Sequence, residues 1–128
     1  ATVVYEGAAL MHASGVATPL SGASAVFIGF ATTRSDNTGG ADGDKHVNIF
    51  RSGEVVINVV NATSGTLTGA PVYATDDGTF ETDGSAQGTR CKIGEVIKFL
   101  GATEGGLTIY GRTATSCLVH FKAHTYTV

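Results

Sequence analysis

The side chains of this chain that are most suited to chemistry gather in one short stretch, GAPVYATDDGTFETDG at positions 69–84. Four of the eleven carboxylates lie there within eight positions: Asp76, Asp77, Glu81 and Asp83. Two carboxylates can act as general acid and base when a cleft raises the pKa of one above that of the other. Several carboxylates together can also bind a divalent cation. The stretch is therefore the first candidate for a catalytic or metal site.

The residues around these carboxylates favour a turn. Asp76-Asp77-Gly78 lies between PVYAT and TFET, two β-type runs, and Asp-Gly is a strong hairpin signal because Gly adopts positive φ and Asp bonds its own backbone. An EF-hand calcium loop needs a glutamate six residues after its glycine, but Gly84 holds that position. A hairpin tip also lacks the desolvation that a paired acid and base require. We expect a solvated tip, with an irregular cation site as the alternative.

The histidines form a second candidate site. His120 and His124 alternate on one face of the last predicted strand and could bind a metal together with His46. No cysteine or acid at metal-ligand spacing completes the set, so we expect the histidines to face solvent. The three aspartates of DNTGGADGD are interpreted in the same way, as solvation of a loop.

Sequence signatures of nucleophilic or nucleotide chemistry are missing. Neither the G-x-S-x-G elbow nor the phosphate loop G-x-x-x-x-G-K-[ST] occurs. Cys91 and Cys117 lack both zinc-knuckle spacing and the density of a disulfide scaffold; we expect two buried thiols, with a disulfide as the alternative. The sequence thus predicts no catalytic residue, no metal ion, no cofactor and no small-molecule substrate.

Length and composition predict one ordered domain. The 128 residues include 18 glycines, 42% are hydrophobic and only 15% are charged. The net charge is −3 and the basic residues are scattered singly, so a nucleic-acid partner is not expected. No run approaches the 18 apolar residues of a membrane span, and ATVVYEG lacks the features of a signal peptide. With Ala1 fitting removal of an initiator Met, we expect a chain made in the cytoplasm.

Hydrophobic alternation with period two predicts an all-β fold, and a sustained helical period is absent. In CLVHFKAHTYTV, for example, Cys117, Val119, Phe121 and Ala123 share one face. The expected strands are 2–5, 8–12, 25–32, 46–50, 54–60, 71–75, 79–82, 91–100, 107–112 and 117–128. Gly-rich turns at short spacing favour a compact β-sandwich, a jelly roll or a small, tulip-like β-barrel.

Two segments need separate interpretation. EVVINVV, from Glu54 to Val60, is rich in β-branched residues and alternates imperfectly, which predicts a strand buried on both faces. Ser52-Gly53 before it is interpreted as a turn or bulge. The segment 34–45, RSDNTGGADGDK, has no apolar residue larger than Ala and predicts a mobile exposed loop, whose contact with a partner is left open.

One arrangement of motifs runs along most of the chain, from residue 20 to 112. It consists of Gly29-Phe30-Ala31, the pair of runs from Val47 to Val55, the hairpin from Gly69 to Thr82, and Ile93 to Val96. With this arrangement the chain resembles the capsid decoration, or cement, proteins of tailed bacteriophages. The motifs mark β-strands and turns and are not catalytic signatures.

The resemblance implies a structural protein on the outer surface of the virion. Its partners would be the major capsid protein and copies of itself, with a homotrimer expected more than a homodimer, and it would bind after the procapsid expands. Residues 1–7 would form an extended N-terminal arm before a β core of 8–128. Within that arm the capsid-binding residues would be Ala1, Thr2, Val3, Val4 and Tyr5. Such β-branched and aromatic residues suit strand addition to a sheet edge.

Two other classes of function remain open. A carbohydrate- or protein-binding β-sandwich module of a fibre or secreted protein is the main alternative, although the chain has no Trp and its four tyrosines are dispersed. A small β-rich enzyme such as a cupin would need histidine ligands, and we expect no bound metal. The cement role needs only a stiff β scaffold, a surface of low charge and no active site, which agrees with the composition.

Overall fold

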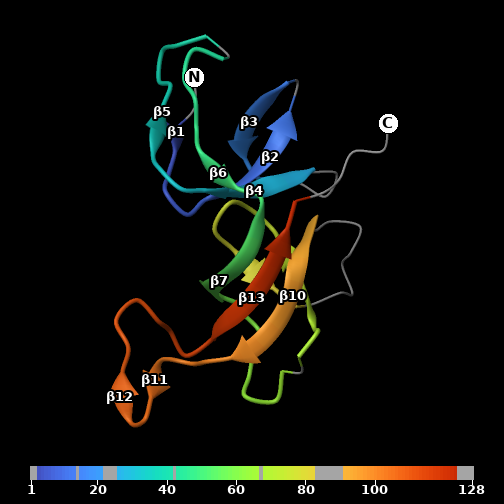
Figure 1. Cartoon of the computed structure of the whole chain (residues 1–128), viewed down its shortest axis with the longest axis vertical. Helices are drawn as coiled ribbons and strands as arrows, with labels where there is room; N and C mark the ends of the chain where they lie inside the picture. The colour runs from blue at the N-terminus through green and yellow to red at the C-terminus, as the bar shows by residue number, and fades with distance from the viewer. Residues whose placement is uncertain are drawn as a thin grey trace.

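The fold is all-β, as the alternation predicts. The structure, a computed structural model, describes residues 3–13, 15–21, 26–41, 43–66, 68–82 and 91–123, and every regular element in these ranges is a strand (Figure 1). The strands are β1 (Val3–Val4), β2 (Ala9–Ala13), β3 (Val16–Pro19), β4 (Phe27–Ala31), β5 (Ser35–Asp36), β6 (Ile49–Phe50), β7 (Ser52–Asn58), β8 (Pro71–Ala74), β9 (Phe80–Glu81), β10 (Cys91–Phe99), β11 (Thr103–Glu104), β12 (Leu107–Thr108) and β13 (Ser116–Lys122).

The strands form two curled antiparallel sheets and two short ribbons. One sheet has the order β7-β13-β10-β8-β9 and the other β3-β2-β4-β6, while β1 pairs with β5 and β11 with β12. Figure 1 shows the four-stranded sheet above the five-stranded one, with the β11–β12 ribbon at the lower left, away from both. Two curled sheets agree with the expected β class. A jelly roll and a free N-terminal arm are not confirmed.

The five-stranded sheet curls until its two edges nearly meet. Just after β7, Val59 forms an isolated parallel bridge with Phe80 of β9, and the Val60 N–H donates to the Phe80 carbonyl at 2.8 Å. Beside this seam, the Thr82 N–H donates to the Asn61 side-chain oxygen at 2.7 Å. The two edge strands of this sheet, β7 and β9, are therefore hydrogen-bonded to each other along only a few residues, just after the end of β7.

Four phenylalanines connect the two sheets at the centre of the core. Phe27 and Phe30 come from β4, Phe80 from β9 and Phe121 from β13, and all four side chains are buried. The Phe30 ring lies 4.8 Å from Phe121, 5.9 Å from Phe80 and 5.5 Å from Phe27, centroid to centroid. The Phe30–Phe121 pair is edge-to-face, a favourable arrangement of aromatic rings.

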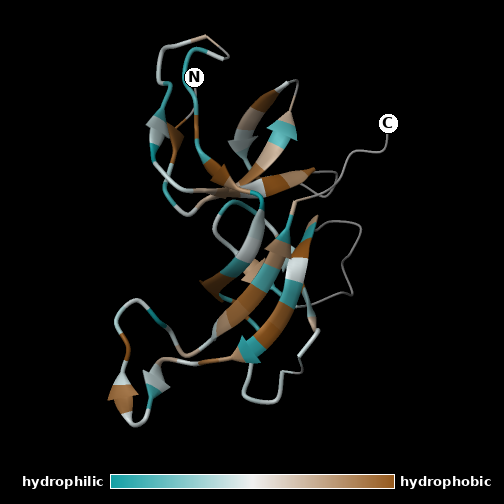
Figure 2. Ribbon diagram, viewed as in Figure 1, coloured by the Kyte–Doolittle hydropathy of each residue, from teal (hydrophilic) through white to brown (hydrophobic). Residues whose placement is uncertain are grey.

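The long strands β10 and β13 add five further side chains to the main core: Cys91, Ile93, Val96, Cys117 and Val119. Cys117, Val119 and Phe121 are buried, while His120 and Lys122 on the opposite face are exposed. Figure 2 shows the resulting alternation of apolar and polar bands along β10 and β13. The predicted faces of the last strand are confirmed up to Ala123, and residues 124–128 lie outside the described part of the chain.

The expectation for Glu54 to Val60 is wrong. Strand β7 begins at Ser52, so Ser52-Gly53 belongs to the strand and is not a separate turn. Its residues alternate between half-buried and exposed, because one face of β7 covers the core and the other faces solvent. The β-branched run made both faces look apolar, although Val56 lies on the solvent face with an exposed fraction of 44%.

Three short strands were not expected from the sequence. β3 lies in a segment with two glycines and a proline, and β11 in another glycine-rich segment. β5 lies within 34–45, where the sequence predicts a loop; it pairs with β1, and the turn after it is internally bonded. There the Thr38 N–H donates to the Asp36 carboxylate and the Asn37 amide donates to the Ala41 carbonyl, both at 2.9 Å. The segment is thus a bonded turn.

Two glycines allow backbones to approach closely. A Cβ at Gly94 in β10 would lie 1.9 Å from the His120 carbonyl oxygen of β13. A Cβ at Gly29 in β4 would lie 2.1 Å from the Phe50 carbonyl oxygen, and its φ of 135° is itself unfavourable for other residues. Only glycine fits at these two positions without moving a neighbouring strand.

Replacing Gly94 by Ala is expected to destabilise the protein strongly. The new methyl group would push β10 away from β13, so the free energy of unfolding should fall by about 2–3 kcal/mol. Gly78→Ala is the matched control, because a Cβ there meets no atom within 4 Å. Urea denaturation of both variants checks this, and equal loss of stability would contradict the close approach.

Candidate functional site

The described part of the N-terminal segment is packed onto the protein. Val3 and Val4 form β1 and pair with Asp36 and Ser35 of β5. The Val4 side chain is only 5% exposed, in a small apolar cluster with Leu10 and its neighbours. An arm that already pairs and buries an aliphatic side chain is not free to add to another protein, so this segment is not an extended arm. Ala1 and Thr2 lie outside the described residues.

Tyr5 is the large side chain of the predicted arm that faces solvent, and Glu6 and Gly7 after it are exposed as well. Its side chain is 60% exposed, and the Arg34 guanidinium lies 5.7 Å from the centre of its ring. A cation above an aromatic face is weakly attractive at an exposed position. Tyr5 is therefore accessible but is held beside the turn of 34–45.

The acidic cluster is a hairpin tip, as predicted. β8 and β9 are antiparallel, and the Thr75 N–H donates to the Thr79 carbonyl at 3.0 Å across the turn. The Asp76 carboxylate accepts the Gly78 N–H at 2.9 Å. This backbone hydrogen bond lowers the pKa of Asp76, because it stabilises the ionised form. Asp83 lies outside the described part of the chain.

The tip also has a structural role that the sequence did not indicate. The Ala9 N–H of β2 donates to the Asp77 carbonyl at 2.9 Å, and Ser21 bridges to Asp76. The hairpin of the five-stranded sheet thereby bonds to the backbone of the other sheet. In the described ranges no group of three His, Cys, Asp or Glu side chains could hold a metal ion.

The histidines and cysteines do not come together in a site. His120 is exposed on β13, His46 lies in a hollow of the other sheet, and His124 is outside the described residues. Cys91 and Cys117 are buried and free, so the expected thiols are confirmed and the disulfide alternative is wrong. Burial raises the pKa of both thiols, which disfavours the reactive thiolate.

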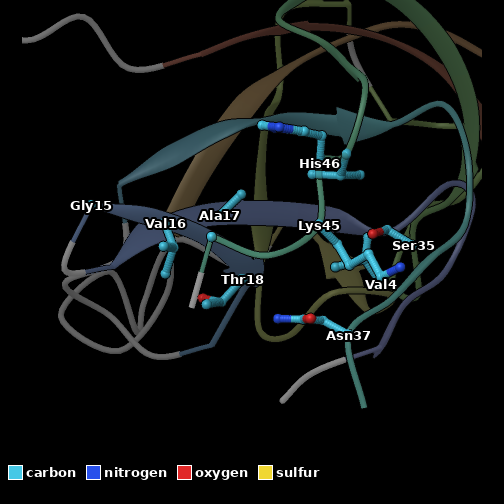
Figure 3. A pocket seen from close by; sticks show the side chains of 11 residues that line it. Val4, Gly15, Val16, Ala17, Thr18, Ser35, Asn37, Lys45 and His46 are labelled. Carbon is cyan, nitrogen blue, oxygen red and sulfur yellow. The ribbon is translucent and has the colours of Figure 1, made fainter. Parts of the chain in front are cut away.

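A hollow of about 340 Å³ lies between β3 and the segment 35–47 (Figure 3). Val16 and Thr18 line one side of it, and Ser35 and Asn37 the other. The Thr18 hydroxyl and the Asn37 side-chain oxygen are buried and have no hydrogen-bond partner among the described residues. Lys45 and His46 add two polar side chains at the rim.

The β11–β12 ribbon is the part of the molecule best placed to bind another surface. The Glu104–Leu107 pair closes a tight turn whose two central residues, Gly105 and Gly106, both have positive φ. Leu107 is 71% exposed and Tyr110, just after the ribbon, is fully exposed. Figure 2 shows that the ribbon extends from the body of the protein. Leu107 and Tyr110 thus expose large side chains on this extension.

Arg112 holds this ribbon in place. Its guanidinium donates to the carbonyls of Gly101 at 3.0 Å, Thr103 at 3.3 Å and Leu100 at 3.4 Å. It also forms an ion pair with Glu104 at 3.2 Å, and only 13% of its side chain is exposed. One side chain therefore ties both ends of the ribbon to the end of β10. A segment held this way presents Leu107 and Tyr110 in a fixed position.

Sequence reasoning missed these residues. The segment 107–112 was interpreted as an ordinary strand, for which one face is expected to be buried. The signal that was available is GATEGGLTIYGR itself: paired glycines beside two large apolar residues, followed by an arginine. The outward direction of Leu107 and Tyr110 depends on the path of the ribbon, which the pattern does not give.

Comparisons with known proteins leave the family open. The chain matches no family model, no curated protein and no solved structure. In the ranges that the structure describes, no helix is long and apolar enough to cross a membrane. The function is therefore inferred from the sequence motifs and from the surface of the protein.

Asp76→Ala is expected to destabilise the protein in a pH-dependent way. The lowered pKa means that the ionised carboxylate contributes stability at neutral pH, and that this contribution is lost as the pH falls below about 4. Since the group is exposed, the loss at pH 7 should be roughly 0.5 kcal/mol. Asp77→Ala is the control, because its side chain makes no hydrogen bond to described residues. A pH-independent effect, measured by urea denaturation, would contradict the assignment.

Arg112→Ala is expected to loosen the ribbon without unfolding the sheets. The Ile109 N–H, which donates to the Ala102 carbonyl at 2.9 Å, should exchange with solvent about tenfold faster, while amides of β10 and β13 keep their protection. Hydrogen exchange measured by NMR checks this. Arg51→Ala, at an exposed arginine without a side-chain contact in the described part, should change neither region. Unchanged exchange at Ile109 would show that Arg112 does not hold the ribbon.

Proposed function

We propose that this chain is a capsid decoration protein, which binds the outer surface of the mature head of a tailed bacteriophage and holds neighbouring capsomers together. The observation that carries the proposal is the ribbon at residues 101–113, which displays Leu107 and Tyr110 from a rigid β scaffold. A protein that works by contact needs such a surface and no reactive centre.

The positions of the sequence motifs support a structural role. Gly29-Phe30-Ala31 lies in β4, the run from Val47 to Val55 covers β6 and part of β7, the Asp-Gly hairpin is β8–β9, and Ile93 to Val96 lies in β10. These motifs thus account for strands and turns of both sheets. The segment that makes the ribbon lies at the end of the resembling region.

The physical requirements of the role are modest. A protein that binds only the expanded lattice stabilises it by about 4 kcal/mol per site when its free concentration is a thousandfold above the dissociation constant. Burying exposed apolar side chains supplies roughly 25 cal/mol for each square ångström removed from water, and tyrosine is favoured at such contacts. Leu107 and Tyr110 provide this apolar surface.

The proposal includes the partners and the location. The partner is the major capsid protein, and the site of action is the outer surface of the virion. The protein acts without catalysis, cofactor or nucleic acid. The ribbon takes the contact role first expected for Ala1 to Tyr5, because Val3 and Val4 are engaged in β1.

Replacing Leu107 and Tyr110 together by Ser is expected to weaken binding to expanded heads about tenfold or more. Binding is measured by co-sedimentation with expanded and unexpanded heads of the phage that encodes the chain, and the unmodified protein should bind only the expanded form. Phe50→Ser is the matched control: it removes a side chain that is 64% exposed on the other sheet and should leave binding unchanged.

Each outcome separates a different part of the proposal. If the unmodified protein does not bind expanded heads, the cement function is wrong. If it binds and the double variant binds equally well, the function stands and the ribbon is not the contact. Reproducible binding on a glycan array, without binding to heads, would favour the carbohydrate-binding module instead.

A further inference from the structure

Among the residues that the structure describes, no strand pairs with the outer edge of β7 along most of its length. β7 is the first strand of the five-stranded sheet and pairs with β13 on one side only (Figure 1). On its other side, the seam to β9 begins at Val59, beyond the end of the strand. The residues from Ser52 to Val56 therefore have an open edge.

The hydrogen-bond pattern shows which backbone groups point outward. The Ala123 N–H donates to the Arg51 carbonyl and the Val59 N–H to the Thr115 carbonyl, so odd-numbered residues of this segment bond to β13. The N–H and C=O groups of Ser52, Glu54 and Val56 point the other way. None of these groups has a hydrogen bond to a described residue.

Three consecutive side chains of β7 are apolar: Val55, Val56 and Ile57. Val55 and Ile57 lie on the inner face, where they pack against the core and are only partly buried. Val56 lies on the outer face and is 44% exposed. Proteins usually protect a long open edge with charged side chains, proline or a bulge; β7 has no proline and no bulge, and its one charged side chain is Glu54. Such an edge is suited to pairing with another strand.

We infer that two copies of this chain pair through β7, antiparallel, about a two-fold axis at Val55. In this register Glu54 lies opposite Val56 of the second copy, and Val55 lies opposite Val55. Every residue of β7 is then opposite a residue of the other β7. The outward-pointing N–H and C=O groups of Glu54 in one copy bond to those of Val56 in the other copy. The two-fold axis repeats this pair of hydrogen bonds on its other side.

The neighbouring registers are disfavoured by features of this edge. Moving the axis to Glu54 would place two glutamates directly opposite each other, which is repulsive. Moving it to Val56 would place Ser52 of the second copy opposite Val60, whose N–H already donates to the Phe80 carbonyl. The register centred on Val55 avoids the pair of glutamates and leaves Val60 unpaired, while Ser52 of the second copy lies opposite Asn58, next to the seam at Val59. It also places Gly53 opposite Ile57, which leaves room for the larger side chain.

This inference does not depend on the proposed function. It predicts a two-fold dimer, whereas the resemblance to decoration proteins favours a trimer over a dimer. A second copy is the occupant that the edge itself supports, because the register centred on Val55 matches the strand to itself in length, separates the two glutamates and places Gly53 opposite Ile57. A strand of another protein is an alternative occupant that the experiment distinguishes.

A cysteine cross-link tests the register. In a non-hydrogen-bonded antiparallel pair the Cα atoms are about 4.5 Å apart, within the range of a disulfide, so Val55→Cys should cross-link two copies on oxidation. Ile57→Cys is the matched control, on the same face, but its Cα atoms would be roughly 13 Å or more apart and should not cross-link. The natural Cys91 and Cys117 are buried and should not interfere.

A proline tests the pairing itself. Val56→Pro removes an N–H that points away from β13, so the fold should be retained, as circular dichroism and urea denaturation will check. Sedimentation equilibrium should show a dimer for the unmodified protein and at least about a tenfold higher dissociation constant for the variant.

The inference is overturned by any of three results. The first is an unmodified protein that remains monomeric at high concentration, which would leave the edge to another protein. The second is an oligomer that Val56→Pro does not weaken. The third is equal cross-linking, or none, by Val55→Cys and Ile57→Cys in the dimer. Should Val56→Pro fail to fold, the two cysteine variants still decide the question.

Discussion

The contact between Phe30 and Phe121 is the interaction on which the rest of the structure depends. Phe30 belongs to the four-stranded sheet and Phe121 to the central strand β13 of the other, and their rings meet edge to face at 4.8 Å. Phe80 joins the same cluster from β9, beside the seam that curls the five-stranded sheet. A chain of 128 residues with 18 glycines has few large side chains for its core, so these rings supply much of the contact area between the sheets.

The sequence predicts the all-β class and the long strands, because their faces are decided locally. In β13 the alternation of apolar and polar residues matches the buried and exposed faces up to Ala123, and Asp76-Asp77-Gly78 is a turn by its own chemistry. The short strands are different. β5 has two residues and exists because β1 lies beside it, which a local pattern does not contain. β11 pairs with β12 across the Gly105-Gly106 turn, a local signal that the sequence analysis did not use. The faces of β7 were misjudged for a related reason: Val56 is apolar but its strand lies at an edge.

The candidate site was predicted less well than the fold. Sequence reasoning correctly gave the acidic hairpin a structural interpretation. It also predicted an extended arm at the N-terminus, where β-branched residues are equally suited to pairing within the protein. Val3 and Val4 pair in this way with β5. The outward direction of Leu107 and Tyr110 follows from the course of the ribbon that Arg112 holds. Arg112 makes three hydrogen bonds to backbone carbonyls and one ion pair with Glu104, and no sequence motif encodes this set of contacts.

The anchoring of the ribbon by Arg112 has a consequence for how the protein can change over evolution. The cost of ordering residues 101–112 is met when the chain folds, so little conformational entropy remains to be lost on contact with a partner. Leu107 and Tyr110 themselves take no part in the core or in the Arg112 contacts. Both side chains are therefore free to be exchanged for others, and a lineage of such proteins can acquire new partners while the two sheets, the phenylalanine cluster and the close glycine contacts stay unchanged.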